Sequence, residues 1–194
     1  MPEPLETVEI ETGPAPRASV ILMHGLGADG NDLVPLAPEL GLADTLSVRF
    51  VLPHAPMRPV TLNRGYVMRA WYDIVERGGE WREDAASVRE SGRLVEALLE
   101  REKRRGIPAQ QIVLAGFSQG GAMALYAGLR HGERLAGVLA LSWALPLADA
   151  LAAAATPTNR ELPIFMAHGT HAPVVQLARA TRSRDLLARL GYRV

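Results

Sequence analysis

Short runs of apolar residues alternate along the chain with segments whose apolar residues recur every three or four positions. Five runs have the length and composition of strands: 19–23, 48–52, 112–115, 137–141 and 163–167. Three of them are hydrophobic almost without interruption, which is typical of strands buried on both faces. Strands that alternate with helical segments predict an α/β fold, with a mostly parallel sheet flanked by helices.

The clearest helix is predicted over 87–105, where apolar side chains recur at helical spacing. Ser87 and Glu90 fit a capping box at its start, because their side chains can satisfy the first backbone N–H groups. Gly106 follows the last apolar position, and a glycine commonly ends a helix.

Between residues 53 and 80 the pattern is irregular, and prolines and glycines interrupt it. Long loops of this kind are uncommon in compact domains and are often functional. The aromatic residues Tyr66, Trp71 and Tyr72 could wall a substrate cleft or could pin the segment to the core, and the sequence leaves both interpretations open.

Composition and charge narrow the class of protein. The chain has 194 residues, of which 48% are hydrophobic and 22% charged, so residues 1–194 are expected to form a single globular domain. Its 21 basic and 21 acidic side chains give a net charge of +0, and a nucleic-acid-binding protein usually has a basic excess. The absence of cysteine excludes disulfides, thiolate metal sites and a cysteine nucleophile.

No secretory signal is recognised at the N-terminus, so a cytoplasmic location is expected. The apolar stretch 135–155 has the length of a membrane span. However, Gly137 and Pro146 interrupt it, and Asp149 would be unpaired in lipid. No membrane span is therefore expected.

The strongest chemical signal is the G-x-S-x-G motif at residues 116–120, centred on Ser118. A predicted strand precedes it and a helical pattern over 121–130 follows. Strand, serine and helix in this order form a nucleophile elbow, whose flanking glycines permit a tight turn. Negative charge beside Ser118 would be stabilised by the helix N-terminus and by the backbone N–H of Gln119.

Two further glycine-containing turns follow predicted strands. His24-Gly-Leu-Gly follows the strand 19–23, and His168-Gly follows the strand 163–167. The C-terminal ends of parallel strands meet at the edge of the sheet where ligands bind, so these turns and Ser118 are expected to form one site. The first turn could supply a second backbone N–H to an oxyanion hole.

These segments resemble the carboxylesterase, phospholipase and acyl-protein thioesterase family of small α/β-hydrolases. The resemblance covers nearly the whole chain in order, through residues 22–30, 50–61, 70–73, 114–121, 141–146 and 167–169. It implies Ser118 as the nucleophile, with the backbone N–H groups of Leu26 and Gln119 as the oxyanion hole. It also implies ester or thioester substrates with apolar acyl groups, no cofactor or metal, and a possible homodimer. Three residues are candidates for substrate contact: Trp71, Trp143 and Leu145.

The chain departs from this family at the catalytic acid. A serine hydroxyl needs a histidine base, and the histidine needs an acid that orients it. The family pattern places an aspartate after the His168-Gly turn, at the position of Ala172. Because alanine offers no acceptor to an imidazole N–H, the acid position is expected to be vacant.

The base is also missing from the sequence, because no histidine follows His171 and the family order is Ser, Asp, His. Residues 174–190 predict a helix, and 191–194 predict the start of a strand. The chain is therefore expected to be incomplete at its C-terminus and to lack the last strand and helix of the fold. A sheet edge and an apolar surface would then be uncovered.

Other residues are poor replacements for the missing groups. His171 would have to reach Ser118 from the wrong loop, and Asp149 could orient a base only if one were present. Of the remaining histidines, His24, His54 and His168 are expected to be structural. His131 is expected to lie at the surface.

Loss of the base costs about 10⁶-fold in the turnover of a serine hydrolase. The sequence therefore predicts a carboxylesterase or thioesterase by family whose own activity is poor. The alternative is a non-catalytic protein that binds acyl ligands in a retained cleft.

Overall fold

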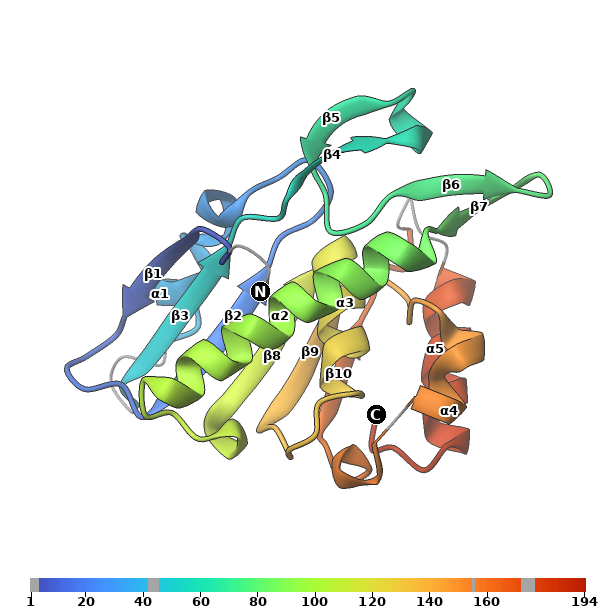
Figure 1. Ribbon diagram of the computed structural model, residues 1–194. Helices are drawn as coiled ribbons and strands as arrows, with labels where there is room; N and C mark the ends of the chain where they lie inside the picture. The colour runs from blue at the N-terminus through green and yellow to red at the C-terminus, as the bar shows by residue number, and fades with distance from the viewer. Residues whose placement is uncertain (1–3, 42–45, 155, 172–176) are drawn as a thin grey trace.

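The computed structural model describes residues 4–41, 46–154, 156–171 and 177–194. Its centre is a sheet in the order β1-β3-β2-β8-β9-β10, in which every pairing is parallel except that of β1 with β3 (Figure 1). The strands of this sheet are β1 Thr7–Glu11, β2 Ala18–Met23, β3 Val48–Pro53, β8 Ile112–Phe117, β9 Gly137–Leu141 and β10 Ile164–Ala167. The five strands predicted from the sequence are all present.

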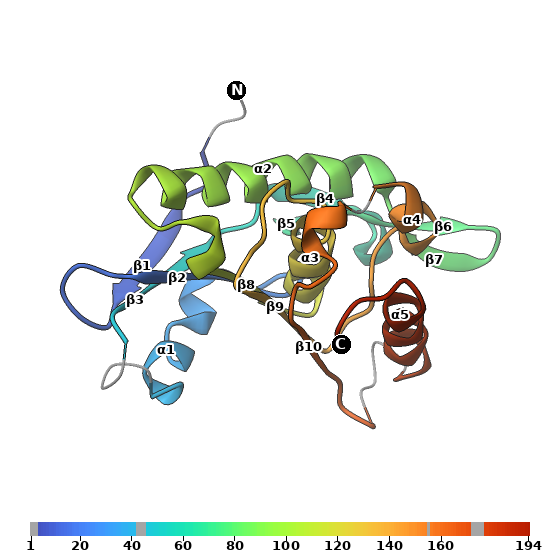
Figure 2. The same cartoon turned by 90° about the horizontal axis from the view of Figure 1, so that it is seen from below.

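Helices flank the sheet, as predicted. Their bounds are α1 Leu36–Glu39, α2 Ala85–Arg104, α3 Gln119–Gly128, α4 Leu151–Ala154 and α5 Leu177–Arg189. Figure 2 shows α2 and α3 on one face of the sheet, α1 on the other, and α5 beyond the β10 edge. No helix of the described residues is long and apolar enough to cross a membrane.

The apolar core has two parts because successive residues of a buried strand point to opposite faces. On β2, Ile21 packs in the larger cluster beneath α2 and α3, and Leu22 packs in a smaller cluster with Phe50 and Ala37 of α1. Both residues are at most 5% exposed. This arrangement explains why the strand sequences are apolar without alternation.

The start of α2 differs from the prediction. The N-cap is Asp84, whose Oδ2 accepts a 2.8 Å hydrogen bond from the backbone N–H of Ser87. Ser87 thus occupies the third helical position and is not the cap, so the predicted capping box of Ser87 and Glu90 is wrong. The predicted end is confirmed, because Gly106 follows the helix with a φ of +94°.

The segment 53–80 is more regular than the sequence suggests. It forms two antiparallel hairpins, β4 Met57–Val60 with β5 Tyr66–Arg69, and β6 Ile74–Arg77 with β7 Glu80–Glu83. Trp71 and Tyr72 lie between the hairpins and are 0% exposed, while Tyr66 is exposed. The structure therefore shows Trp71 and Tyr72 pinning this segment to the core.

At the other edge of the sheet, the last residues return toward β10. Arg193 forms an isolated parallel bridge with Pro163, and its carbonyl accepts a 3.0 Å hydrogen bond from the N–H of Ile164. A groove of about 760 Å³ lies beside this edge, lined among others by Leu139, Phe165 and Val194. Phe165 is 60% exposed, so an apolar surface is uncovered there, as the sequence predicted.

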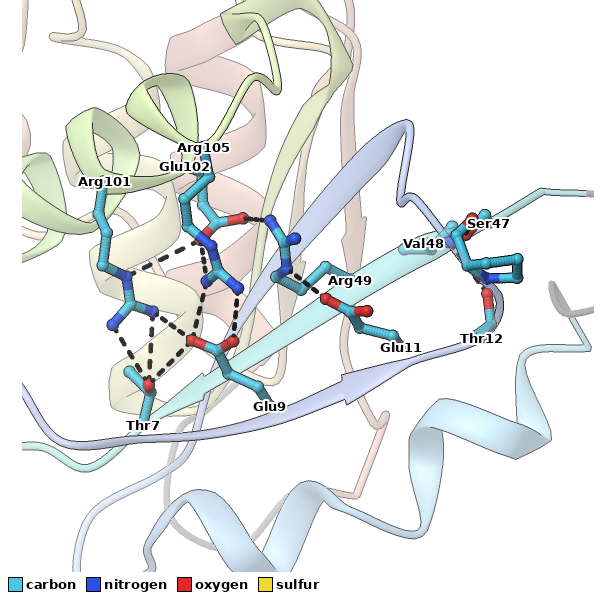
Figure 3. Close-up of polar contacts among 11 residues, drawn as sticks. Thr7, Glu9, Glu11, Thr12, Ser47, Val48, Arg49, Arg101, Glu102 and Arg105 are labelled. Carbon is cyan, nitrogen blue, oxygen red and sulfur yellow. Dashed lines mark hydrogen bonds and ion pairs between the residues drawn. The ribbon is translucent and has the colours of Figure 1, made fainter.

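A network of charged side chains joins β1 and β3 to the C-terminal end of α2 (Figure 3). Arg49 of β3 donates to Glu102 of α2 at 3.0 Å and to Glu11 of β1 at 2.9 Å. Arg105 donates to Glu102 and to Glu9, each at 2.9 Å. Glu102 is 0% exposed, so these cations balance a fully buried carboxylate.

Candidate active site

The predicted nucleophile elbow is present between β8 and α3. Ser118 has a φ of +55° and a ψ of −124°, a strained conformation for a residue with a side chain. The turn requires glycine on both sides of Ser118. A Cβ on Gly116 would lie 2.2 Å from the carbonyl carbon of Gly120, and one on Gly120 would lie 2.1 Å from the oxygen of Met23.

The loop that follows β2 packs directly on this elbow. A Cβ on Gly25 would lie 3.2 Å from the Cβ of Ser118, so this turn lies beside the serine and leaves little room for a side chain at position 25. The N–H of Gly27 donates to the carbonyl of Arg69 at 2.9 Å. The N–H of Leu26, by contrast, has no acceptor among the residues that the structure describes.

Gln119 ties the elbow to the segment between the two hairpins. Its side-chain Oε1 accepts a 3.0 Å hydrogen bond from the N–H of Trp71, and its Nε2 donates to the carbonyl of Tyr72 at 2.9 Å. Its own backbone N–H lies in the first position of α3, where helices have no internal acceptor for an N–H. The side chain of Gln119 is thus structural, and its N–H remains a candidate oxyanion donor.

Trp71 is also linked to the loop after β2. Its indole Nε1–H donates to the carbonyl of His24 at 2.9 Å, and its own carbonyl accepts from Ser91 Oγ. The ring centroids of His24 and Trp71 are 5.5 Å apart. These long-range partners give no signal in the sequence, which predicts Trp71 only as part of an irregular segment and as a candidate for substrate contact.

The other two candidates for substrate contact are also buried. Trp143 is 6% exposed and Leu145 is 4% exposed, and both belong to the larger apolar cluster. The N–H of Leu145 donates to Ser183 Oγ of α5 at 3.0 Å. Contact of Trp71, Trp143 or Leu145 with a substrate stays a prediction.

Two of the histidines have structural roles, as predicted. The Nε2 of His24 accepts a 3.0 Å hydrogen bond from the N–H of Ala55, and its Nδ1 lies 2.7 Å from the carbonyl oxygen of Gly25. Burial lowers the pKa of His24, because it disfavours the charged ring. His54 accepts from the N–H of Gly30 at 3.1 Å.

The prediction that His131 lies at the surface is wrong. This histidine is 3% exposed and its Nδ1 is 2.9 Å from Glu96 Oε1 of α2, because the turn after α3 folds back beneath that helix. His171 is exposed and its Nδ1 contacts the hydroxyl of Thr170 at 3.0 Å. Within the described part of the chain, no histidine forms a hydrogen bond with Ser118.

The remaining sequence candidates lie elsewhere or outside the described residues. Ala172, at the predicted acid position, is outside them. Asp149 lies in a groove of about 450 Å³ between the 144–149 segment and α5, which also contains Arg182. No group of three or more His, Cys, Asp or Glu side chains in the described ranges is arranged to hold a metal ion.

Comparison with known proteins gives one consistent result. The model of the phospholipase/carboxylesterase family matches residues 5–194. Acyl-protein thioesterase 1 of Neurospora crassa is 42% identical over 185 residues, which are 91% of this chain and 76% of the relative. Acyl-protein thioesterase 1 of Cryptococcus neoformans is 37% identical over 198 residues, covering 100% of this chain and 83% of the relative.

Solved structures of the same fold superimpose closely. SOBER1 of Arabidopsis thaliana has a TM-score of 0.85 at 28% identity, covering 91% of this chain and 85% of its own. Acyl-protein thioesterase 2 of Zea mays has a TM-score of 0.81 at 26% identity, covering 96% of this chain and 85% of its own. The family match, the similar sequences and the nucleophile elbow agree, and the chain belongs to the phospholipase/carboxylesterase family of α/β-hydrolases.

Proposed function

We propose that Ser118 cleaves carboxylic esters or thioesters through an acyl-enzyme, with the backbone N–H groups of Leu26 and Gln119 as the oxyanion hole. The observation that carries this proposal is the closeness of Gly25 to Ser118, where a Cβ on the glycine would lie 3.2 Å from the serine Cβ. The loop that contains Leu26 therefore lies beside the elbow. This placement supports an oxyanion hole in which the N–H groups of Leu26 and Gln119 donate to the substrate's carbonyl oxygen during acyl transfer.

The chemistry follows from this arrangement. The Ser118 hydroxyl gives its proton to solvent water as its oxygen attacks the carbonyl carbon, and the carbonyl oxygen becomes an oxyanion that accepts hydrogen bonds from the N–H groups of Leu26 and Gln119. Collapse of this intermediate breaks the bond to the leaving group, which takes a proton from solvent and departs as the alcohol or thiol, and leaves an acyl group on Ser118. Water then attacks the acyl carbonyl through a second oxyanion, the bond to Ser118 breaks, and the carboxylic acid and the protonated Ser118 hydroxyl are released.

We further propose that the polypeptide of these 194 residues turns substrate over slowly. Four of the described histidines, at positions 24, 54, 131 and 171, contact Gly25, Ala55, Gly30, Glu96 and Thr170 rather than Ser118, and Ala172 cannot orient a base. Loss of the base costs about 10⁶-fold in turnover. About 10³–10⁴-fold acceleration over water remains when the oxyanion hole and substrate binding persist.

The substrate class is supported by the similar proteins. Several of them are named acyl-protein thioesterases, which supports thioesters with apolar acyl groups as substrates of this chain as well. A homodimer and a cytoplasmic location are part of the same proposal.

The test compares the 194-residue chain with its Ser118→Ala variant. Hydrolysis of p-nitrophenyl butyrate is followed by colour, and hydrolysis of a butyryl thioester by a thiol reagent, which does not react with this cysteine-free protein. We expect slow turnover that Ser118→Ala abolishes. Fast turnover would show that a base does reach Ser118. Saturable binding of the ester, seen as a change in tryptophan fluorescence without hydrolysis, would favour the non-catalytic acyl-binding alternative.

A further inference from the structure

We infer that His24 is a positioning residue that orients the Leu26 N–H of the oxyanion hole, an inference that rests on the proposed function of Ser118. His24 is 0% exposed, and no step of the proposed chemistry uses it. Its ring contacts two backbone groups, the N–H of Ala55 and the carbonyl of Gly25.

The partners of His24 assign its tautomer. Nε2 accepts from the amide N–H of Ala55 at 3.0 Å, so it carries no hydrogen. The neutral ring therefore has its hydrogen on Nδ1, and this N–H donates to the carbonyl oxygen of Gly25 at 2.7 Å. A second, longer bond from the N–H of Ala28 reaches the same oxygen at 3.3 Å.

The Gly25 carbonyl belongs to the peptide unit that contains the Leu26 N–H. This unit is planar and trans, so its C=O and N–H point in opposite directions. When the imidazole holds the Gly25 oxygen, it fixes the direction of the Leu26 N–H. Rotation of this peptide would break the His24 bond and turn the Leu26 N–H away from an oxyanion.

The preceding peptide is held as well. The carbonyl of His24 accepts from the indole N–H of Trp71 at 2.9 Å, so both peptides that flank Gly25 have fixed carbonyls. Gly25 needs this restraint because glycine is the residue with the most backbone freedom. The buried Trp71 thus also restrains the loop after β2 that contains Leu26.

The experiment measures the tetrahedral adduct that Ser118 forms with butylboronic acid. The Ser118 oxygen bonds to boron, the serine proton goes to solvent, and the anionic boronate presents oxygen to the oxyanion hole. Because the adduct is an equilibrium state that releases its proton to solvent, it forms without a general base, and the affinities of all variants are compared at one fixed pH. Tetrahedral boron is observed directly by ¹¹B NMR, and titration gives the dissociation constant.

Two substitutions of His24 separate its two hydrogen bonds. His24→Asn places an amide N–H where Nδ1 lies and keeps the bond to Gly25, whereas His24→Gln extends an amide oxygen toward Ala55 and loses that bond. We expect His24→Gln to weaken the adduct about 10-fold or more, and His24→Asn to remain within about threefold of the unsubstituted protein. His131→Gln is the matched control, because it removes a buried histidine at the opposite end of α3.

An unchanged affinity in His24→Gln would overturn the inference, and with a loss in His24→Asn it would mean that His24 only anchors Ala55. An equal loss in both variants would also overturn it, because the bond to Gly25 would then not be what sets the affinity. If His24→Gln does not fold, Trp71→Phe tests the same restraint. It removes the donor to the His24 carbonyl and is expected to weaken the adduct by more than about threefold. An affinity within about threefold of the unsubstituted protein would also overturn the inference. Absence of any Ser118-dependent adduct in the unsubstituted protein would instead refute the proposed nucleophile, and the inference with it.

Discussion

Gly25 lies so close to Ser118 that a Cβ on the glycine would be 3.2 Å from the serine Cβ, so the loop that carries one proposed oxyanion donor lies beside the proposed nucleophile. In the sequence these two residues are nearly half the chain length apart. The parallel order of β2 beside β8 brings them together, because both turns follow the C-terminal ends of adjacent strands. The site is therefore built by the topology of the sheet and adjusted by local contacts.

Gly25→Ala tests this contact. The new methyl group would lie 3.2 Å from Ser118 Cβ and 3.5 Å from a ring carbon of Phe117, so the loop must shift by a few tenths of an ångström. We expect the affinity for butylboronic acid to fall about 10-fold, because the Leu26 N–H moves with the loop. Gly132→Ala is the control, since a Cβ there meets nothing within 4 Å and should leave the affinity unchanged.

Gly120→Ala is expected to damage the fold itself. Its Cβ would lie 2.1 Å from the oxygen of Met23 and 2.7 Å from the oxygen of His24. These are backbone atoms of a central strand and its turn, so no side-chain movement relieves the overlap. We expect a loss of about 3 kcal/mol or more in the free energy of unfolding, measured by urea denaturation. Stability equal to that of the unsubstituted protein would contradict the close packing of α3 on β2.

The parts of the fold that the sequence predicts correctly are those in which local pattern and tertiary environment agree. The central strands are buried on both faces, so their apolar runs are unambiguous. β1 is not among the predicted strands, because its alternation rests on only two apolar residues, Val8 and Ile10, which is a weak periodic signal. At α2, both Asp84 and Ser87 are good capping residues, and only the structure shows that Asp84 begins the helix.

In the candidate site as well, the sequence predicts the local motif but not the contacts between distant residues. The elbow at Ser118 is a local motif and is readable from five consecutive residues. The side-chain bonds of Gln119 to the 71–72 segment, and of His24 to Ala55, join positions that are far apart in the chain. Such partners depend on how the elements pack, which the spacing of residues does not encode.

The charged network at the base of the sheet provides a stability test. Glu102→Gln would leave the Arg49 guanidinium, whose side chain is 9% exposed, without its buried counter-charge. Breaking a buried ion pair by removing one partner costs about 3–5 kcal/mol, and we expect a loss in this range in urea denaturation. Glu80→Gln is the control, because its pair with Arg82 is exposed and such pairs contribute about 0–1 kcal/mol. Equal effects of the two substitutions would show that the network does not contribute as a buried unit.

The neutral state of His24 predicts how stability depends on pH. Burial lowers the pKa of its imidazole in the folded chain, while the unfolded chain has the ordinary value of about 6.5. Asp29 and Asp32 nearby raise this pKa and His54 lowers it, but burial is the largest effect. As pH falls below about 6.5, the unfolded state binds a proton that the folded state does not, so the free energy of unfolding decreases.

This decrease is expected to continue until the pH reaches the folded pKa, with a slope of up to about 1.4 kcal/mol per pH unit from this one group. Urea denaturation at pH 7.5, 6.5, 5.5 and 5.0 measures it above the range in which most carboxylates titrate. His24→Asn lacks the titrating ring, so its curve should be flatter over the same interval. The other histidines are common to both proteins and cancel in the comparison. Parallel curves for the two proteins would mean that the folded chain protonates His24 as readily as the unfolded chain does, which would contradict the lowered pKa.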